Sequence, residues 1–216
     1  MGGATLGARV SGPIGIFGGT FDPIHIAHLA VAEEAAEALG LERVVFIPAG
    51  IPPHKPDRAI TPGEHRLAMV ELAIAGNARF ASDRRELDRP GRSYTVDTLE
   101  ALRRETPSEL ALIISADSYL DLMSWREPRR ILELARLIVA PRDGFPSAGP
   151  DFLAANLPDL ADRATVLEGP HLHLSASELR ARAGAGRSLR YLVPDAVAAY
   201  ISDHGLYTDH KRTPTS

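Results

Sequence analysis

The 216-residue sequence contains no cysteine, and it has no long apolar run. The absence of cysteine excludes a disulfide framework and a thiolate metal site. No apolar stretch approaches the roughly 20 residues that a membrane-spanning helix needs. The Gly-rich start lacks the continuous apolar segment of a signal peptide. We therefore expect a cytoplasmic protein with no membrane partner.

Positive charge is also scarce, because 24 Lys and Arg residues face 28 Asp and Glu residues, for a formal net charge of −4. A general nucleic-acid binder normally carries a basic surplus, so we expect no nucleic-acid partner. A nucleotide ligand stays compatible, since a phosphate site needs only a few local positive groups. Hydrophobic residues make up 44% of the chain, which is close to the globular average and predicts an ordered domain.

Short apolar runs alternate with helical patterns along most of the chain. The predicted strands are 13–17, 44–47, a short one at Phe80, 110–115, 137–140 and 166–167, and the predicted helices are 29–39, 61–76 and 94–105. This alternation predicts an α/β fold with a doubly wound parallel sheet. In the second helix, Thr61 is expected to cap, with Pro62 in the first helical position and Glu64 completing a capping box.

The chain shows no internal repeat and no long linker, which predicts a single domain over residues 13–206. Residues 175–206 are expected to form a small helical C-terminal part of that domain. Residues 1–12 are expected to be a flexible extension, and residues 207–216 a loose tail.

The segment after the first strand carries the main functional signal. Gly18 and Gly19 allow close backbone approach to a ligand, and Thr20 adds a hydroxyl. His25 and His28 follow at a spacing that lets both imidazoles reach one anionic group near the start of a helix. The segment is neither a G-x-G-x-x-G nor a Walker loop. Two histidines in place of a fixed charge suit the stabilisation of a phosphate in transfer. A zinc site or two helix-capping histidines are the structural alternatives.

The run GGTFDPIHIAHL resembles the bacterial nicotinate-nucleotide adenylyltransferases, a branch of the HxGH nucleotidyltransferases with a Rossmann-like fold. Ala27 stands where that family usually has glycine. The resemblance extends over nearly the whole chain. It implies transfer of adenylate from ATP to nicotinate mononucleotide, which gives deamido-NAD and pyrophosphate in NAD biosynthesis.

Further segments carry the resemblance: PPHK around Lys55, SYTVDT from Ser93, SADS with Ser115 for a family glycine, Trp125 in LMSWR, and SASELR with Ala176 and Ser177 for the family's Ser and Thr. They imply catalytic roles for His25, His28, Lys55 and Arg180. The implied ATP site comprises Gly18, Gly19, Thr20, Phe21, His28, Asp117, Ser175, Ser177 and Arg180. The implied nicotinate mononucleotide site comprises Thr20, Lys55, Thr95, Val96 and Trp125. An exposed turn, helix caps and a core tryptophan are the alternative interpretations of these segments.

The implied reaction needs no nucleophilic side chain. A phosphate monoester has a second pKa near 6, so it is largely dianionic at neutral pH and can attack the α-phosphorus of ATP directly. No covalent enzyme intermediate is then expected. Mg²⁺ would arrive on the ATP phosphates, mostly through water, because no acidic cluster is placed to hold it. A nicotinamide-mononucleotide or pantetheine-phosphate adenylyltransferase, a cytidylyltransferase and an inactive nucleotide-binding regulator are the alternatives. Self-association is left open.

Overall fold

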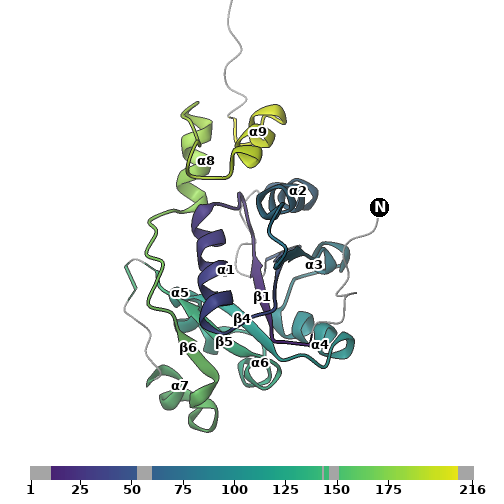
Figure 1. Ribbon diagram of the computed structural model, residues 1–216, viewed down its shortest axis with the longest axis vertical. Helices are drawn as coiled ribbons and strands as arrows, with labels where there is room; N and C mark the ends of the chain where they lie inside the picture. The colour runs from purple at the N-terminus through teal and green to yellow at the C-terminus, as the bar shows by residue number, and fades with distance from the viewer. Residues whose placement is uncertain (1–10, 53–59, 143, 146–150, 209–216) are drawn as a thin grey trace, which may run out of the picture.

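The computed structural model describes residues 11–52, 60–142, 144–145 and 151–208 (Figure 1). Lys55 lies outside the described residues. The same holds for most of the segments that we predict to be a flexible extension and a loose tail.

A parallel sheet forms the centre of the described part of the chain, with strand order β3-β2-β1-β4-β5-β6. Its strands are β1 (Ile14–Gly19), β2 (Arg43–Pro48), β3 (Phe80–Ser82), β4 (Leu110–Ser115), β5 (Arg136–Ala140) and β6 (Ala164–Val166). From β1 the chain winds outward to β3, returns to place β4 beside β1, and winds outward again to β6. The predicted doubly wound sheet is confirmed, and its winding direction changes between β1 and β4.

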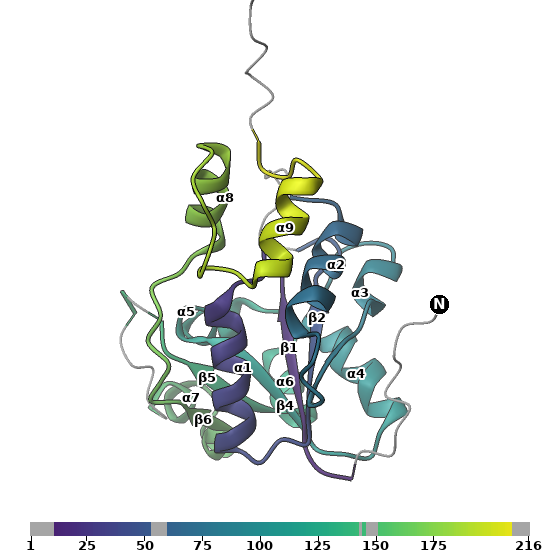
Figure 2. The same cartoon turned by 45° about the horizontal axis from the view of Figure 1, so that its top comes forward.

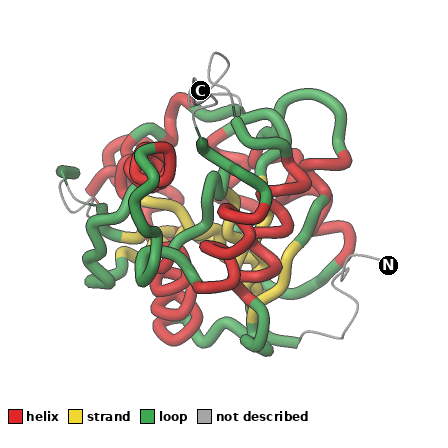
Figure 3. The backbone as a smooth tube through the Cα atoms, turned by 90° about the horizontal axis from the view of Figure 1, so that it is seen from above, coloured by secondary structure: helices red, strands yellow, loops and turns green. Residues whose placement is uncertain are grey.

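Helices cover both faces of this sheet (Figures 2 and 3). In chain order they are α1 (Ile26–Ala38), α2 (Gly63–Ile74), α3 (Arg85–Asp88), α4 (Thr95–Glu105), α5 (Ala116–Leu120), η1 (Leu122–Ser124), α6 (Pro128–Leu134), α7 (Asp151–Asn156), η2 (Pro158–Arg163), α8 (Ala176–Gly184) and α9 (Asp195–Asp203). Within the described residues, no helix combines the length and the apolarity needed to cross a bilayer.

Side chains of successive strand residues enter two separate apolar cores. In β2, Val44 and Phe46 join the core under α1 and α2, whereas Val45 and Ile47 join the core under α4 and α6. This is the period of two that a strand imposes. Because both faces are buried, the strands are nearly uniformly apolar, as the sequence indicates.

Two helix starts differ from the prediction. Helix α1 begins at Ile26, so His25 is its N-cap and His28 belongs to its first turn. In α2, Pro62 is the N-cap because its carbonyl accepts the N–H groups of His65 and Arg66, at 3.1 and 3.3 Å. The predicted capping box of Thr61 and Glu64 is therefore wrong.

The loops above the sheet are joined by one buried guanidinium, that of Arg66 on α2, which is 2% exposed. Its Nη1 donates to the Thr20 carbonyl at 2.9 Å, its Nε to the Thr61 carbonyl at 2.8 Å and its Nη2 to the Gly50 carbonyl at 3.4 Å. These carbonyls belong to the loop after β1, the loop after β2 and the start of α2. Arg66 thus fixes the three segments relative to one another.

The C-terminal part is helical from α8 through α9, as predicted, and it lies beyond the carboxyl ends of the strands (Figure 1). Tyr207, which we assigned to a loose tail, is held in the fold. It packs against the core under α1 and α2, and its hydroxyl donates to the Asp22 carboxylate at 2.8 Å. The prediction missed this contact because its partners are far apart in the sequence.

Replacement of Arg66 by methionine should lower the free energy of unfolding by about 3 kcal/mol or more, because three buried carbonyls lose a charged donor. Arg79→Met is the matched control, since Arg79 pairs with Glu33 at 2.9 Å on the surface, with 45% of its side chain exposed. That control should cost less than about 1 kcal/mol. Urea unfolding of both variants measures the difference, and equal losses would contradict the role given to Arg66.

Candidate active site

Two cavities open at the carboxyl ends of the strands, where the winding direction of the sheet changes. Ligands of open α/β sheets bind at such a place. The first cavity has a volume of about 860 Å³ and the second about 490 Å³. Both are lined by Phe17, Thr20, Phe21, His28, Ile114, Ser115 and Arg142. The two cavities thus meet at the predicted loop after β1.

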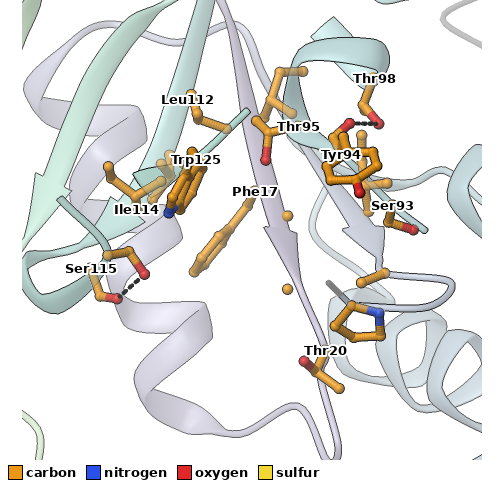
Figure 4. Close-up of a pocket in the computed structure, with 18 of the residues that line it drawn as sticks. Phe17, Thr20, Ser93, Tyr94, Thr95, Thr98, Leu112, Ile114, Ser115 and Trp125 are labelled. Atoms are coloured by element: carbon orange, nitrogen blue, oxygen red, sulfur yellow. Dashed lines mark hydrogen bonds between the residues drawn. The ribbon is translucent and has the colours of Figure 1, made fainter. Parts of the chain in front are cut away.

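The first cavity brings together residues predicted for a pyridine nucleotide. Figure 4 shows Trp125 on one side, near Ile114, and Tyr94 and Thr95 on the other. Trp125 follows η1, and its indole is only partly buried. The arrangement leaves a slot between an aromatic face and the start of α4.

Helix α4 begins at this slot, because Tyr94 and Thr95 line the first cavity. Tyr94 is its N-cap, and no side chain caps the helix, so the alternative in which Ser93 or Thr95 caps it is wrong. The Ser93 hydroxyl instead accepts the Gly50 N–H at 2.9 Å. Thr95 and Val96 occupy the first two helical positions, whose amides have no partner within a helix. A helix start of this kind binds anions.

The buried carboxylate of Glu86, on α3, contacts α4. The Thr98 hydroxyl donates to Glu86 Oε1 at 2.6 Å (Figure 4). Burial raises the pKa of Glu86, and the hydroxyls of Thr98 and Ser93 and the charge of Arg89 counteract this rise. The contact ties α3 to the helix that carries Thr95.

Gly18 and Gly19, which we predicted to follow the first strand, are its last two residues, and they make room for different groups. A Cβ on Gly18 would meet nothing within 4 Å, and this residue lines the first cavity. A Cβ on Gly19 would lie 3.0 Å from the Phe21 ring. Gly18 therefore leaves space for a ligand, whereas Gly19 leaves space for the Phe21 ring of the loop that follows.

The imidazole rings of His25 and His28 stack on each other. Their ring centroids are 3.6 Å apart with an interplanar angle of 24°. The N–H of His25 donates to His28 Nδ1 at 3.2 Å, so the helix-capping alternative holds in part. For zinc, the described residues contain no group of three potential ligands. His25 lines the second cavity and His28 lines both, which brings the pair to the junction.

Burial keeps both imidazoles uncharged. It lowers the pKa of His25 to about 4, and the positive charge of Arg142 adds to the effect. The pKa of His28 is also well below its ordinary value, through burial, then His25, then Arg142. At neutral pH the pair therefore provides neutral N–H donors. An arriving phosphate would raise both pKa values, because an opposite charge favours the protonated ring.

The second cavity brings together the predicted Ser175, Ser177 and Arg180. Ser175 caps α8 by accepting the Glu178 N–H at 3.2 Å. Arg180 Nη2 donates to Ser177 Oγ at 3.0 Å, and its Nη1 donates to the Asp22 backbone carbonyl. Hydroxyl and guanidinium donors of this kind suit phosphate oxygens. Ala27 also lines this cavity, so its methyl group takes some of the space.

Asp117, predicted for ATP, lines the first cavity rather than the second. Its Oδ1 is buried without a hydrogen-bond partner, and its Oδ2 lies 3.5 Å from Arg142 Nε. A carboxylate oxygen in this state can accept a ligand hydroxyl. The nearby Ser115 hydroxyl donates to Ser118 Oγ at 3.3 Å (Figure 4).

Sequence reasoning missed Arg142, a cation that lines both cavities. Arg142 follows the end of β5, so the strand-end rule could have found it. Asp22 and Tyr207 were also missed, and no local pattern indicates their contact. Pro52 lines the first cavity, but the predicted Lys55 lies outside the described residues. The ligand roles of the predicted residues stay predictions.

The chain is similar to known proteins over most of its length. Residues 16–182 match the family described as Cytidylyltransferase-like. A relative from Roseiflexus sp. (strain RS-1), named "Probable nicotinate-nucleotide adenylyltransferase", is 51% identical over 197 residues, which cover 91% of this chain and 98% of the relative. A relative of the same name from Thermus thermophilus is 47% identical over 195 residues, covering 90% of this chain and 98% of the relative.

The fold also resembles a solved structure, "Plasmodium falciparum nicotinic acid mononucleotide adenylyltransferase complexed with NaAD". The TM-score is 0.72, with coverage of 91% of this chain and 97% of that chain. At 19% sequence identity this likeness shows a shared fold alone.

The lowered pKa of His25 should make the protein less stable in mild acid. Between its unfolded pKa near 6.5 and its folded value of about 4, only the unfolded state takes up the proton. The free energy of unfolding should therefore fall as the pH drops below about 6.5, by roughly 3 kcal/mol at pH 4 from this group. Urea unfolding at several pH values measures the slope, which should flatten in His25→Asn. The exposed His204→Asn serves as control, and equal slopes for wild type and His25→Asn would refute the effect.

Proposed function

Because the chain belongs to the family of nicotinate-nucleotide adenylyltransferases, within the cytidylyltransferase-like proteins, we propose that it transfers adenylate from ATP to nicotinate mononucleotide. The products are nicotinate adenine dinucleotide (deamido-NAD) and pyrophosphate, and the reaction belongs to NAD biosynthesis. The observation that carries this proposal is the junction of the two cavities at His25 and His28. One cavity presents an indole and helix amides, and the other presents hydroxyls and a guanidinium.

The first cavity receives nicotinate mononucleotide. Trp125 stacks on the pyridine ring, a contact that contributes roughly 0.5–1.5 kcal/mol beyond burial. The Thr95 hydroxyl and the amides of Thr95 and Val96 donate to the pyridine carboxylate. A set of neutral donors at a helix start favours a carboxylate over a carboxamide. Asp117 accepts a hydrogen bond from a ribose hydroxyl, which its unpartnered Oδ1 supports.

ATP occupies the junction and the second cavity. The loop from Gly18 to Phe21 faces its α-phosphate, with the open side of Gly18 toward the substrates. Ser175, Ser177 and Arg180 bind the β- and γ-phosphates. Lys55 adds a further phosphate contact in this proposal, which follows from the family resemblance alone.

The reaction is one in-line displacement. An oxygen of the nucleotide's 5′-phosphate dianion forms a bond to the α-phosphorus, and the bond from that phosphorus to the bridging oxygen breaks. The leaving group is pyrophosphate, so no general base and no covalent enzyme intermediate are needed. His25 and His28 donate N–H groups to the oxygens that gain charge, and the two cavities align the reactants.

Magnesium would accompany ATP. The described residues contain no group of three His, Asp or Glu side chains that could hold a metal ion, and Ser175, Ser177 and Arg180 of the second cavity suit phosphate oxygens. The phosphates and water would therefore hold Mg²⁺, which neutralises part of their charge.

We also propose that the protein acts in the cytoplasm, with ATP and nicotinate mononucleotide as its small-molecule partners.

The alternatives leave observed features without a role. A pantetheine-phosphate adenylyltransferase or a cytidylyltransferase would not use the slot between Trp125 and α4. An inactive nucleotide-binding regulator would not need His28 at the junction of both cavities. A nicotinamide nucleotide would also fit the slot by shape. Only the missing negative charge of its carboxamide would distinguish it from the nicotinate nucleotide.

His28→Ala should reduce kcat by about 10²–10³-fold while folding normally, because it removes one donor to the transferring phosphate. Pyrophosphate release from ATP and nicotinate mononucleotide measures this loss, and circular dichroism checks the fold. His204→Ala, an exposed histidine at the end of α9, should behave as wild type. Near wild-type turnover of His28→Ala would refute the mechanism.

The enzyme should prefer nicotinate mononucleotide over nicotinamide mononucleotide in kcat/KM, because the donors near Thr95 face a carboxylate. Thr95→Val keeps the side-chain shape and removes the hydroxyl, so it should narrow this preference by about tenfold. The same pyrophosphate assay with each acceptor gives both ratios. Equal kcat/KM values for the two acceptors in the wild type would refute the roles of Thr95 and Trp125.

A further inference from the structure

The loop after β1 contains a buried carboxylate, that of Asp22, which the reaction above does not use. Asp22 is 4% exposed. Its Oδ1 accepts from the Tyr207 hydroxyl at 2.8 Å. Its Oδ2 accepts the Thr61 N–H at 3.4 Å and lies 3.9 Å from Arg180 Nη1. The carboxylate therefore lies between a C-terminal tyrosine and the arginine of the second cavity.

Tyr207 is fixed by several elements at once. Besides Asp22, its hydroxyl lies 3.9 Å from Met69 Sδ on α2. A Cβ on Gly184, the last residue of α8, would come within 3.0 Å of the Tyr207 carbonyl oxygen. Tyr207 also adopts a φ of +65°, a left-handed conformation that a non-glycine residue keeps only where its surroundings hold it. Its hydroxyl thus has a defined position relative to α2, α8 and the loop.

The Arg180 guanidinium donates hydrogen bonds within the protein and also lines the second cavity. Its side chain is 15% exposed, with Nη2 on Ser177 and Nη1 on the Asp22 backbone carbonyl. At 3.9 Å, its contact with the Asp22 carboxylate is longer than a hydrogen bond. A closer, bidentate pair with Asp22 would compete directly with phosphate for the same guanidinium.

We propose that Tyr207 is a positioning residue for ATP binding. Its hydroxyl donates a hydrogen bond to Oδ1 of Asp22. This oxygen is then not available for a bidentate ion pair between the Asp22 carboxylate and Arg180. Arg180 then remains available to the β- and γ-phosphates. The inference rests on the proposed function, since it gives a role to a residue outside the two cavities in the binding of that substrate.

Tyr207→Phe, which keeps the ring and removes the hydroxyl, tests this role. It should weaken binding of a non-hydrolysable ATP analogue about five- to tenfold in calorimetry, a loss that corresponds to one hydrogen bond. The KM for ATP should rise similarly, with the KM for nicotinate mononucleotide and kcat nearly unchanged. Tyr200→Phe is the matched control, because the Tyr200 hydroxyl contacts His65 at 2.9 Å and Tyr200 lines neither cavity. It should bind the analogue as wild type does.

A double-mutant cycle separates positioning from a general structural effect. In an Arg180→Ala background, Tyr207→Phe should cause no further loss of analogue binding, because the hydroxyl acts through that arginine. A loss that persists in this background, or that affects both substrates equally and follows a lower Tm, would overturn the proposal. Because the analogue is not hydrolysed, the binding comparison stands even where wild type fails to adenylate nicotinate mononucleotide. That failure would refute the proposed function instead.

Discussion

Helices cover both faces of the parallel sheet, so the strand ends are where its backbone and the following loops can present polar groups. The carboxyl ends of β1 and β4 meet where the winding direction changes, and the two cavities open there. Buried loops must satisfy their own backbone groups. Arg66 does this for three segments, because its guanidinium donates a hydrogen bond to a backbone carbonyl of each. The geometry of the site thus depends on a residue that lines neither cavity and was not itself predicted to bind a ligand.

The electrostatics of the junction follow from the same burial. His25 and His28 are held uncharged mainly by burial, and the positive charge of Arg142 lowers their pKa values further. In the proposed reaction, Arg142 and Arg180 would attract the ATP phosphates, and the two histidines would donate hydrogen bonds to the reacting phosphate.

Local patterns located the strands of the described sheet but not all of their bounds. The predicted 13–17 stops before Gly18 and Gly19, which belong to β1, and the predicted 166–167 shares only Val166 with β6. Apolar runs such as 110–115 match β4 residue for residue, because a strand buried on both faces has no polar position to interrupt it. The predicted start of α2 was wrong because both Thr61 and Pro62 are residue types that suit a helix start. In the structure the Pro62 carbonyl accepts the first N–H groups of the helix, which makes Pro62 the N-cap. The roles of Arg66 and Tyr207 could not be predicted, since Thr20 and Gly50, two of the three partners of Arg66, and Asp22, the partner of Tyr207, are distant in sequence. The ligand roles of residues such as Asp117 and Ser177 remain predictions that rest on resemblance.

The contact between Asp22 and Tyr207 spans 185 positions of the chain. During synthesis, the loop after β1 emerges well before Tyr207. A nascent chain can therefore form much of the sheet before the carboxylate of Asp22 meets its hydroxyl partner. The contact therefore closes the fold after every strand of the described sheet has been synthesised.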